Sequence, residues 1–289
     1  MNKIPEYLTQ ENLDHFIKNA LLEDIQDGDH STLSTIPEDL QQSAKLLVKE
    51  NCILAGVEMA EIIFKTFDEN LEIENFIKDG EQAKVGDIAF IVKGSARSIL
   101  STERLVLNCM QRMSGIATLT HDWDARLIGS KTKLLDTRKT TPNFRICEKW
   151  AVAIGGGTNH RYGLYDMIML KDNHIDYNGS ITNAVKMAKE YVQTIGKELK
   201  IEVETRNLDE VKEALEAGAD RIMLDNMNVE TMKKAVEMVN GACETEASGG
   251  ITRDMLKDVA TTGVTYISAG ALTHSAKNID LSLKAIKTL

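Results

Sequence analysis

A regular spacing of short apolar strands is the feature that most constrains the fold of this chain. Apolar runs begin near residues 201, 221, 243 and 264, so successive starts lie 20 to 22 residues apart. Amphipathic helical patterns fill the intervals between them. Strand–helix units of this length are typical of a parallel β/α barrel. Two earlier runs, "KLLD" and "MIMLKD", bring the clear strands to six, so either weak strands are hidden in the pattern or the barrel is incomplete.

The first part of the chain has a different, mixed pattern. A helix is expected over residues 10–22, and "AKLLVKENCILAG", "LEIENFI" and "DIAFIVKG" are typical of strands. A long helical pattern follows over residues 98–128, with Gly115 as a weak point. Arg104 should lie near the N-terminus of that helix, where the helix dipole disfavours a cation. We therefore predict an α/β chain with a small α/β domain before the barrel.

Polar side chains follow each strand of the predicted barrel. The carboxyl ends of barrel strands form one rim, and in β/α barrels that rim carries the active site. Residues far apart in the sequence should therefore converge there. The strand-end residues are Asp136, Thr137, Arg138, Lys139, Lys171, Asp172, Asn173, His174, Glu204, Asp225, Asn226, Ser248, Gly249, Gly250, Ser268, Ala269 and Gly270.

The charges are distributed unevenly along the chain. The net charge is −10, which argues against a general binder of nucleic acid or of anionic membranes. Residues 131–174 nevertheless contain eight Lys or Arg against four Asp or Glu, and so carry a charge of +4. Such a cationic segment in an acidic protein indicates a substrate with several negative charges.

Two glycine-containing turns and two carboxylates suggest how such a substrate is held. The turns "SGG" at 248–250 and "SAG" at 268–270 offer backbone N–H groups to phosphate oxygens, although each could also be a tight turn that needs positive φ. Glu204 and Asp225 would repel a phosphate unless sugar hydroxyls or Mg²⁺ intervened. An ion pair with Lys171 or Arg161 is the alternative role for these carboxylates.

Other sequence features narrow the class of protein. No apolar run reaches the roughly 18 residues of a membrane span, and the first residues lack a signal-peptide pattern. The four cysteines are scattered without a CxxC motif, so we expect reduced thiols, no metal site on them and a cytoplasmic location. "GGGTNHR" at 155–161 lacks the spacing of a dinucleotide loop, so His160 and Arg161 instead join the cationic group.

At this point the sequence resembles a known family. The segment "LLDTRKTTPNFRICEKWAVAIGGGTNHRYGLYDMIMLKDNHI" is similar to quinolinate phosphoribosyltransferases, also called carboxylating nicotinate-nucleotide pyrophosphorylases. "ALLEDIQDGDHST", "ERLVLNCMQRMSGIAT", "GADRIMLDNM", "EASGGIT" and "ISAGALTHS" extend the resemblance over nearly the whole chain. Asn143 stands where the family pattern has a glycine after "TTP".

The resemblance implies a fold, a reaction and an assembly. The fold would be an N-terminal α/β sandwich domain over residues 1–113 and an open, about seven-stranded β/α barrel over residues 114–274. The tail, residues 275–289, would pack on the first domain. The implied enzyme is a glycosyltransferase of NAD biosynthesis that converts quinolinate and phosphoribosyl pyrophosphate to nicotinate mononucleotide, pyrophosphate and CO₂ with Mg²⁺. It would act as a homodimer with a shared active site, without nucleic-acid or membrane partners.

The resemblance also implies roles for individual residues. Arg104 would come from the partner subunit, and Mg²⁺ would bind through pyrophosphate together with Glu204 and Asp225. The implied catalytic residues are Lys139, Lys171, Glu204 and Asp225. The implied quinolinate-binding residues are Arg104, Thr137, Arg138, Lys139, His160, Arg161 and Lys171. The implied residues for phosphoribosyl pyrophosphate are Lys139, Glu204, Asp225, Ser248, Gly249, Gly250, Ser268 and Gly270.

Two functions of other kinds stay open at this level. Lys171 at the end of a barrel strand is also consistent with a Schiff-base aldolase. The same scaffold could serve as a phosphate-ligand binding or regulatory protein without turnover. A homologue of the family associated with molybdenum uptake shares the fold, but the full basic set of this chain favours the biosynthetic enzyme.

Overall fold

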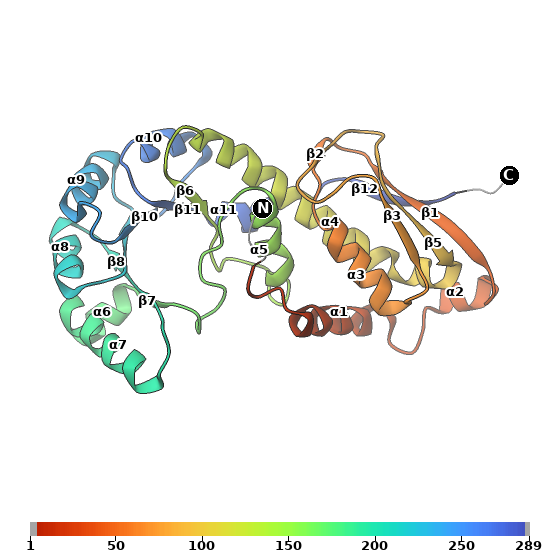
Figure 1. Cartoon of the computed structure of the whole chain (residues 1–289), viewed down its shortest axis with the longest axis horizontal. Coiled ribbons are helices and arrows are strands. Elements are labelled where there is room, and N and C mark those ends of the chain that lie inside the picture. The colour runs from red at the N-terminus through yellow and green to blue at the C-terminus, as the bar shows by residue number, and fades with distance from the viewer. Residues whose placement is uncertain (1–4, 287–289) are drawn as a thin grey trace. The chain divides into compact units, whose positions relative to one another are not determined.

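The computed structural model describes residues 5–286, which contacts within the chain divide into two units. The first unit takes the described residues up to His121, with Thr140–Gly156 and the segment from Leu272 onward. The second unit takes Asp122–Lys139 and Gly157–Ala271. Each unit is built on its own sheet (Figure 1). The boundary between residues 113 and 114 stays a prediction.

The first unit contains a four-stranded antiparallel sheet in the order β12-β1-β5-β3. Its helices and strands, in chain order, are α1 (Gln10–Ile25), α2 (His30–Thr35), β1 (Gln41–Val48), β2 (Cys52–Ile53), α3 (Val57–Phe67), β3 (Glu72–Asn75), β4 (Gln82–Ala83), β5 (Ile88–Ser95), most of α4 (Ala96–Asp124), α5 (Arg145–Ile154), most of α11 (Ala271–His274) and β12 (Leu281–Ala285). The expected first helix and strands are confirmed.

The core of this unit follows from alternation along its strands. Leu46 and Val48 of β1 are buried because every second side chain faces the same side of the sheet. The rings of Phe64 from α3 and Phe90 from β5 meet edge to face, with centroids 6.0 Å apart. The tail returns to this sheet, since β12 pairs antiparallel with β1. Residues 287–289 of the predicted tail segment lie outside the described residues.

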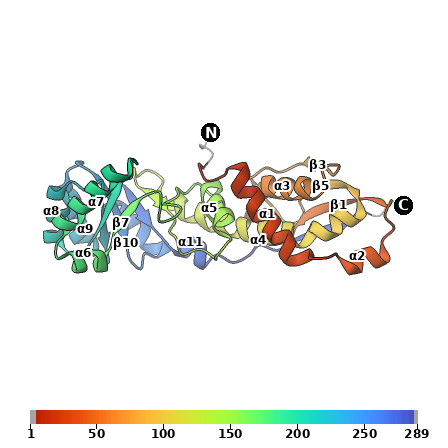
Figure 2. The same cartoon turned by 90° about the horizontal axis from the view of Figure 1, so that it is seen from below.

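The second unit contains six parallel strands in the order β6-β11-β10-β9-β8-β7. Helices α7, α8 and α9 lie outside these strands in both views (Figures 1 and 2). The elements, beyond the end of α4, are η1 (Ala125–Leu127), β6 (Lys133–Leu135), β7 (Ile168–Leu170), α6 (Asp172–Asn178), α7 (Ile181–Ile195), β8 (Ile201–Thr205), α8 (Leu208–Ala217), β9 (Arg221–Asp225), α9 (Val229–Val239), β10 (Glu244–Ser248), η2 (Arg253–Met255), α10 (Leu256–Ala260) and β11 (Tyr266–Ser268). The predicted open β/α barrel is confirmed.

The opening of the barrel lies between β6 and β7, which are the two end strands of the sheet. A single parallel bridge joins Leu135 to Thr158 beyond β6. The Thr158 N–H donates to the Leu134 carbonyl at 2.8 Å, and the Asp136 N–H donates to the Thr158 carbonyl at 3.2 Å. This bridge lies where a seventh strand would pair with β6. The structure therefore has six strands and one bridged pair, where the resemblance implied about seven strands.

Local sequence sets the ends of the barrel helices. The side chains of Ser180, Asn207 and Asn228 each accept a backbone N–H of the first turn of α7, α8 and α9. Gly218 and Asn240 end α8 and α9 in the left-handed conformation. These caps keep the connections short and bring each strand end to the same rim.

Two expectations about the long helix are wrong. Helix α4 runs without a break through Gly115, which instead permits a close packing contact, because a Cβ there would lie 1.9 Å from the Lys277 carbonyl oxygen. Arg104 lies beyond the first two turns, since the helix already begins at Ala96. The helix dipole acts within the first turn, so it does not disfavour this cation. Within residues 5–286 no helix is both long and apolar enough to cross a membrane.

Candidate active site

The carboxyl ends of the barrel strands bring most of the predicted site residues to one rim. Glu204 is the last residue but one of β8, Asp225 ends the neighbouring β9, and Asp225 is in register with Ser248 at the end of β10. Ser268 ends β11, and Lys171 directly follows β7. Convergence follows from the parallel topology, because all these strands point the same way.

The cationic loop after β6 is held at its start by a buried carboxylate. Asp136 is fully buried and accepts hydrogen bonds from the side chain of Asn159 at 2.7 Å and from the His160 N–H at 2.8 Å. The loop then turns locally, with the Lys139 N–H donating to the Thr137 hydroxyl at 3.1 Å. Asp136 therefore places the cationic loop next to the segment that carries the other cations.

Two arginines of the site lie close enough to repel each other. Burial lowers the pKa of Arg161, and the nearby charge of Arg138 lowers it further. The Arg161 guanidinium is oriented by the Met167 carbonyl, which accepts from Nη1 at 3.0 Å. Guanidinium groups bind carboxylates in a two-point geometry, so a dianion between this pair would relieve their repulsion.

The side chain of His160 turns into the barrel interior instead of facing solvent. Its Nε2 lies 3.0 Å from Glu202 and 3.3 Å from Glu246, and all three side chains are nearly inaccessible. Burial opposes a charge on the ring, but the hydrogen bonds and charges of the two carboxylates outweigh it and raise the pKa of His160 to about 9. The Arg161 N–H donates to Nδ1 at 2.6 Å. Protonation of Nδ1 would cost that hydrogen bond, which opposes a charge on the ring.

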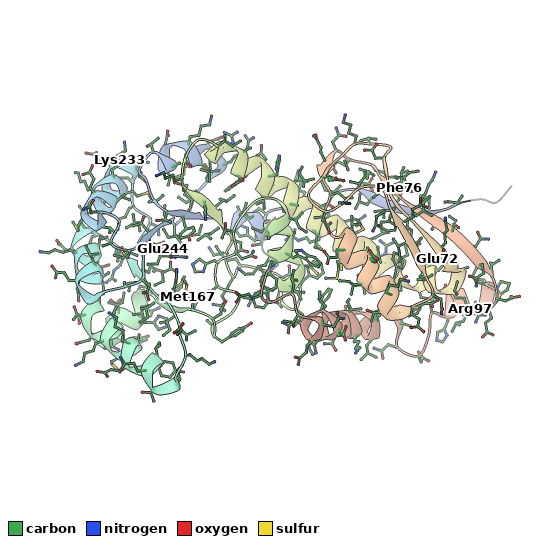
Figure 3. All side chains as sticks on the ribbon, in the orientation of Figure 1. Glu72, Phe76, Arg97, Met167, Lys233 and Glu244 are labelled. Carbon is green, nitrogen blue, oxygen red and sulfur yellow. The ribbon has the colours of Figure 1, made fainter. Side chains whose placement is uncertain are left out.

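The interior carboxylates were not anticipated from the sequence. Glu202 and Glu204 alternate along β8, as Glu244 and Glu246 do along β10, so each pair shares the inward face. Glutamates at every second position of a buried strand are the signal that could have shown them. Figure 3 shows Glu244 inside the ring of strands, whereas Lys233 lies on the outer helical layer.

An arginine neutralises this interior cluster. The Arg221 Nη1 lies 3.2 Å from Glu246 and 3.9 Å from Glu202, and its Nη2 lies 3.0 Å from Glu244. His160, Glu202 and Glu246 offer three donor atoms within 4.8 Å of one another, a set that could hold a metal ion. Because the Arg221 guanidinium already donates a hydrogen bond to Glu246 at 3.2 Å, the arrangement serves better as an ion cluster.

At the rim, one of the two predicted carboxylates is ion-paired. Lys171 Nζ lies 3.5 Å from Glu204, so the ion-pair role considered from the sequence is present. Asp225 accepts a hydrogen bond from the side chain of Asn226 at 2.6 Å. Oxygen donors at the ends of adjacent strands are the ligands that Mg²⁺ prefers, and Glu204 and Asp225 fit that requirement.

The "SGG" turn needs its glycines for structural reasons as well. Gly249 has φ +92°, and a Cβ there would lie 2.3 Å from the side-chain oxygen of Asn226. Gly250 also has positive φ, but it faces open space. Asn143, which replaces the expected glycine, has φ +63°, a conformation that Asn tolerates better than most residues. The tight-turn explanation of Gly249 is therefore correct.

The predicted residues do not all lie in one unit. Arg104 is exposed on α4 and belongs to the first unit, whereas the other predicted site residues belong to the second. Within the second unit, the cationic loop, the carboxylates and the glycine turns share one rim of an open β/α barrel. This combination is typical of a β/α-barrel protein whose rim binds polyanionic small molecules.

Matches to known proteins identify the family. Residues 29–114 match "Quinolinate phosphoribosyl transferase, N-terminal domain", and residues 116–284 match "Quinolinate phosphoribosyl transferase, C-terminal domain". The chain therefore belongs to the quinolinate phosphoribosyltransferase family, the carboxylating nicotinate-nucleotide pyrophosphorylases of NAD biosynthesis. The resemblance drawn from the sequence is confirmed, and membership favours the transferase over the aldolase and the binding protein.

Individual relatives match along most of their length. The chain is 49% identical over 285 residues to the chloroplastic nicotinate-nucleotide pyrophosphorylase [carboxylating] of Oryza sativa, covering 93% of this chain and 76% of the relative. It is 44% identical over 271 residues to the probable enzyme of that name from Bacillus subtilis, covering 94% and 91%. The crystal structure of NadC from Streptococcus pyogenes superposes with a TM-score of 0.89 at 39% identity, covering 97% and 99%.

Proposed function

We propose that the rim of this barrel joins quinolinate to the phosphoribosyl group of phosphoribosyl pyrophosphate and releases pyrophosphate and CO₂. The observation that carries this assignment is that two half-buried arginines, Arg138 and Arg161, lie near each other at the rim, where two guanidinium groups can bind one dianion. Quinolinate is a planar dicarboxylate and matches two guanidinium forks. Thr137, Lys171 and the His160 segment would complete the quinolinate pocket.

The reaction balances without an external oxidant or reductant. The quinolinate ring nitrogen forms a bond to the anomeric carbon of ribose, and the bond from that carbon to pyrophosphate breaks. The ring nitrogen becomes cationic, so the adjacent carbon can lose its carboxylate as CO₂ and keep the electron pair. A proton from solvent then replaces the carboxylate and gives nicotinate mononucleotide.

The carboxylates at the rim would act on the ribose. Positive charge develops on the sugar as pyrophosphate departs, and Glu204 and Asp225 can stabilise it electrostatically. Lys171, now 3.5 Å from Glu204, would contact quinolinate, and Lys139 would lie between the two substrates. Mg²⁺ held by pyrophosphate with Glu204 and Asp225 would neutralise the leaving group.

The glycine turns would hold the phosphates. Ser248 ends β10 and is followed by Gly249 and Gly250, and Ser268 ends β11, two residues before Gly270. Backbone N–H groups in such turns bind phosphate oxygens, and in β/α barrels phosphates commonly bind after the last two strands. Ser268 is buried, and the Ala269 N–H donates to the Leu135 carbonyl at 3.0 Å, so within this turn Gly270 is the better candidate for a phosphate contact.

Substrate choice tests this assignment. Quinolinate should react and nicotinate should be a poor substrate, because nicotinate lacks the second carboxylate that separates the two arginines. Leaving such a cation without its partner costs on the order of several kcal/mol. Comparable kcat/KM for the two compounds would show that the site does not require a dicarboxylate.

We further propose a homodimer in which Arg104 completes the site of the other subunit. Arg104 is exposed on α4, which supports a contact outside its own unit. Arg104→Ala and Arg138→Ala dimers should each be nearly inactive. Random reassortment of the two should restore roughly a quarter of parental activity, because half of the dimers are mixed and each has one intact site. Confirmed heterodimers without activity would mean that Arg104 acts within its own chain.

We also propose a cytoplasmic location. The cysteines are free thiols, and Cys52, Cys109 and Cys147 are buried, as expected in a reducing compartment. Fractionation of cells that express the chain with a fluorescent tag would test the assignment, and accumulation in an organelle would contradict it.

A further inference from the structure

A fully buried carboxylate on α5 has no role in the reaction described above. Glu148 is 0% exposed, yet both of its oxygens are hydrogen-bonded. Oε1 accepts from the Arg112 guanidinium at 2.9 and 3.0 Å and from the Thr141 hydroxyl at 3.0 Å. Oε2 accepts from the Thr141 N–H at 2.9 Å. A buried ion pair this well satisfied is held in one geometry.

The arginine of this ion pair also binds a second stretch of backbone. Arg112, on α4, donates from Nη1 to the Ala276 carbonyl at 2.7 Å and from Nη2 to the Thr273 carbonyl. The guanidinium thus uses its planar fork for Glu148 and its remaining donors for two main-chain oxygens. Arg112 thus connects Glu148 to the backbone at Thr273, within α11, and at Ala276, just after that helix.

The two segments held by this ion pair are the downstream ends of the two substrate loops. Thr141 follows Lys139 of the cationic loop by two residues, and Thr273 follows Gly270 of the phosphate turn by three. A further hydrogen bond strengthens the first anchor, since Arg145 Nε donates to the Thr140 hydroxyl at 2.9 Å. The start of the cationic loop is fixed by Asp136, so Glu148 supplies the matching anchor at its end.

We propose that Glu148 and Arg112 are positioning residues that fix the cationic loop and the phosphate turn in a set register for the two substrates. The inference rests on the proposed function, because it assigns quinolinate to one loop and phosphoribosyl pyrophosphate to the other. A buried ion pair contributes little net stability compared with apolar packing, but it is strongly directional. Here its hydrogen bonds reach main-chain groups that adjoin both loops in the sequence, so they can fix the position of each loop.

The contacts of the ion pair with the two loops can be weakened separately by substitution. Thr141→Val keeps the shape of the side chain but removes the hydroxyl bond to Glu148, so the KM for quinolinate should rise about fivefold with little change in the KM for phosphoribosyl pyrophosphate. Thr141→Ser keeps the hydroxyl and should restore parental values. Arg112→Lys keeps the charge beside Glu148 but loses the fork, so the KM for phosphoribosyl pyrophosphate should rise about tenfold and that for quinolinate less.

The chain offers a control at the surface. Thr182 donates its N–H and its hydroxyl to one oxygen of Glu213 at 2.8 and 2.9 Å, on helices outside the barrel strands. Because this contact is exposed, Thr182→Val should lower thermal stability less than Thr141→Val, and it should leave both KM values at parental levels. This separates positioning from a general effect on folding.

Opposite results are easily recognised. Equal changes in both KM values, or losses that merely follow the unfolding temperature in Thr141→Val and Arg112→Lys, would overturn the positioning role. Failure of the proposed function looks different, because the parental chain itself would then not turn over quinolinate. In that case calorimetry can measure the Kd values for quinolinate and for inorganic pyrophosphate. Thr141→Val should then weaken quinolinate binding and Arg112→Lys should mainly weaken pyrophosphate binding. Equal changes in both Kd values would overturn the inference.

Discussion

The two units bury ionic groups in opposite ways. In the first unit, both oxygens of Glu148 are saturated by Arg112 and Thr141. In the second unit, Glu202 has ion contacts with His160 and Arg221, but among the described residues neither of its oxygens has a well-aligned hydrogen bond. The first cluster is bonded through both oxygens of its carboxylate, whereas in the second the directed hydrogen bonds of Arg221 go to Glu244 and Glu246, and Glu202 has ion contacts.

This difference indicates different tasks. A saturated ion pair suits a structural anchor, because each bond specifies a position and none is left to rearrange. An ion cluster with incompletely bonded oxygens under the rim instead sets the local electrostatic field, and its members titrate together. Burial and the charge of Glu246 raise the pKa of Glu202, which shows that crowding of like charge. We expect the two clusters to respond differently to mutation and to pH.

The largest contrast should come from removing each arginine. Arg221→Met leaves the buried Glu202 and Glu246 with His160 as their remaining cation, and should lower the free energy of unfolding by about 3–5 kcal/mol. Arg112→Met should cost less, because Thr141 still donates twice to Glu148. Urea unfolding of both variants measures the difference. A larger loss in Arg112→Met would reverse the comparison.

The next contrast is in pH dependence. The pKa of His160, raised by Glu202 and Glu246 from 6.5 to about 9, favours the folded state below pH 6.5. That contribution should be lost as pH rises through 9, and it amounts to at most about 3 kcal/mol because the Arg161 N–H at Nδ1 opposes protonation. Between these pH values, the free energy of unfolding of His160→Gln should change less with pH than that of the parent. The free energy of unfolding of Thr141→Val should change with pH as the parental value does. Superimposable slopes for His160→Gln and the parent would mean that the ring stays neutral.

Carboxylates at the rim should affect catalysis without affecting folding. Glu204→Gln and Asp225→Asn each keep size and remove charge, so kcat should fall about tenfold, which corresponds to about 1.4 kcal/mol of transition-state stabilisation. Quinolinate affinity should survive. Asp209→Asn, on the exposed first turn of α8, is the control and should behave like the parent. Unchanged kcat in both rim variants would make these carboxylates structural.

The smallest effect should come from an exposed ion pair. Arg253 and Asp122 are paired, but both side chains are nearly half exposed, and water and salt screen such pairs. Arg253→Gln should therefore leave the unfolding midpoint unchanged within error. A shift as large as that of Arg112→Met would show that burial is not what separates the clusters.

The sequence predicted the features that depend on local spacing. The strand–helix period after Lys131 is a local property, and so the open barrel and the rim followed from it. The interior cluster depends on which faces of β8, β9 and β10 point inward and on where a loop places His160, so it required the three-dimensional structure. Gly115 was misread for the same reason, because its neighbour Lys277 is distant in sequence.

The most direct test is the stoichiometry of products. Purified protein with quinolinate, phosphoribosyl pyrophosphate and Mg²⁺ should release pyrophosphate and CO₂ in equal amounts with nicotinate mononucleotide, and Arg138→Ala should abolish all three together. Release of pyrophosphate without CO₂ from quinolinate, or full activity in Arg138→Ala, would contradict the assignment of the rim as the quinolinate phosphoribosyltransferase site.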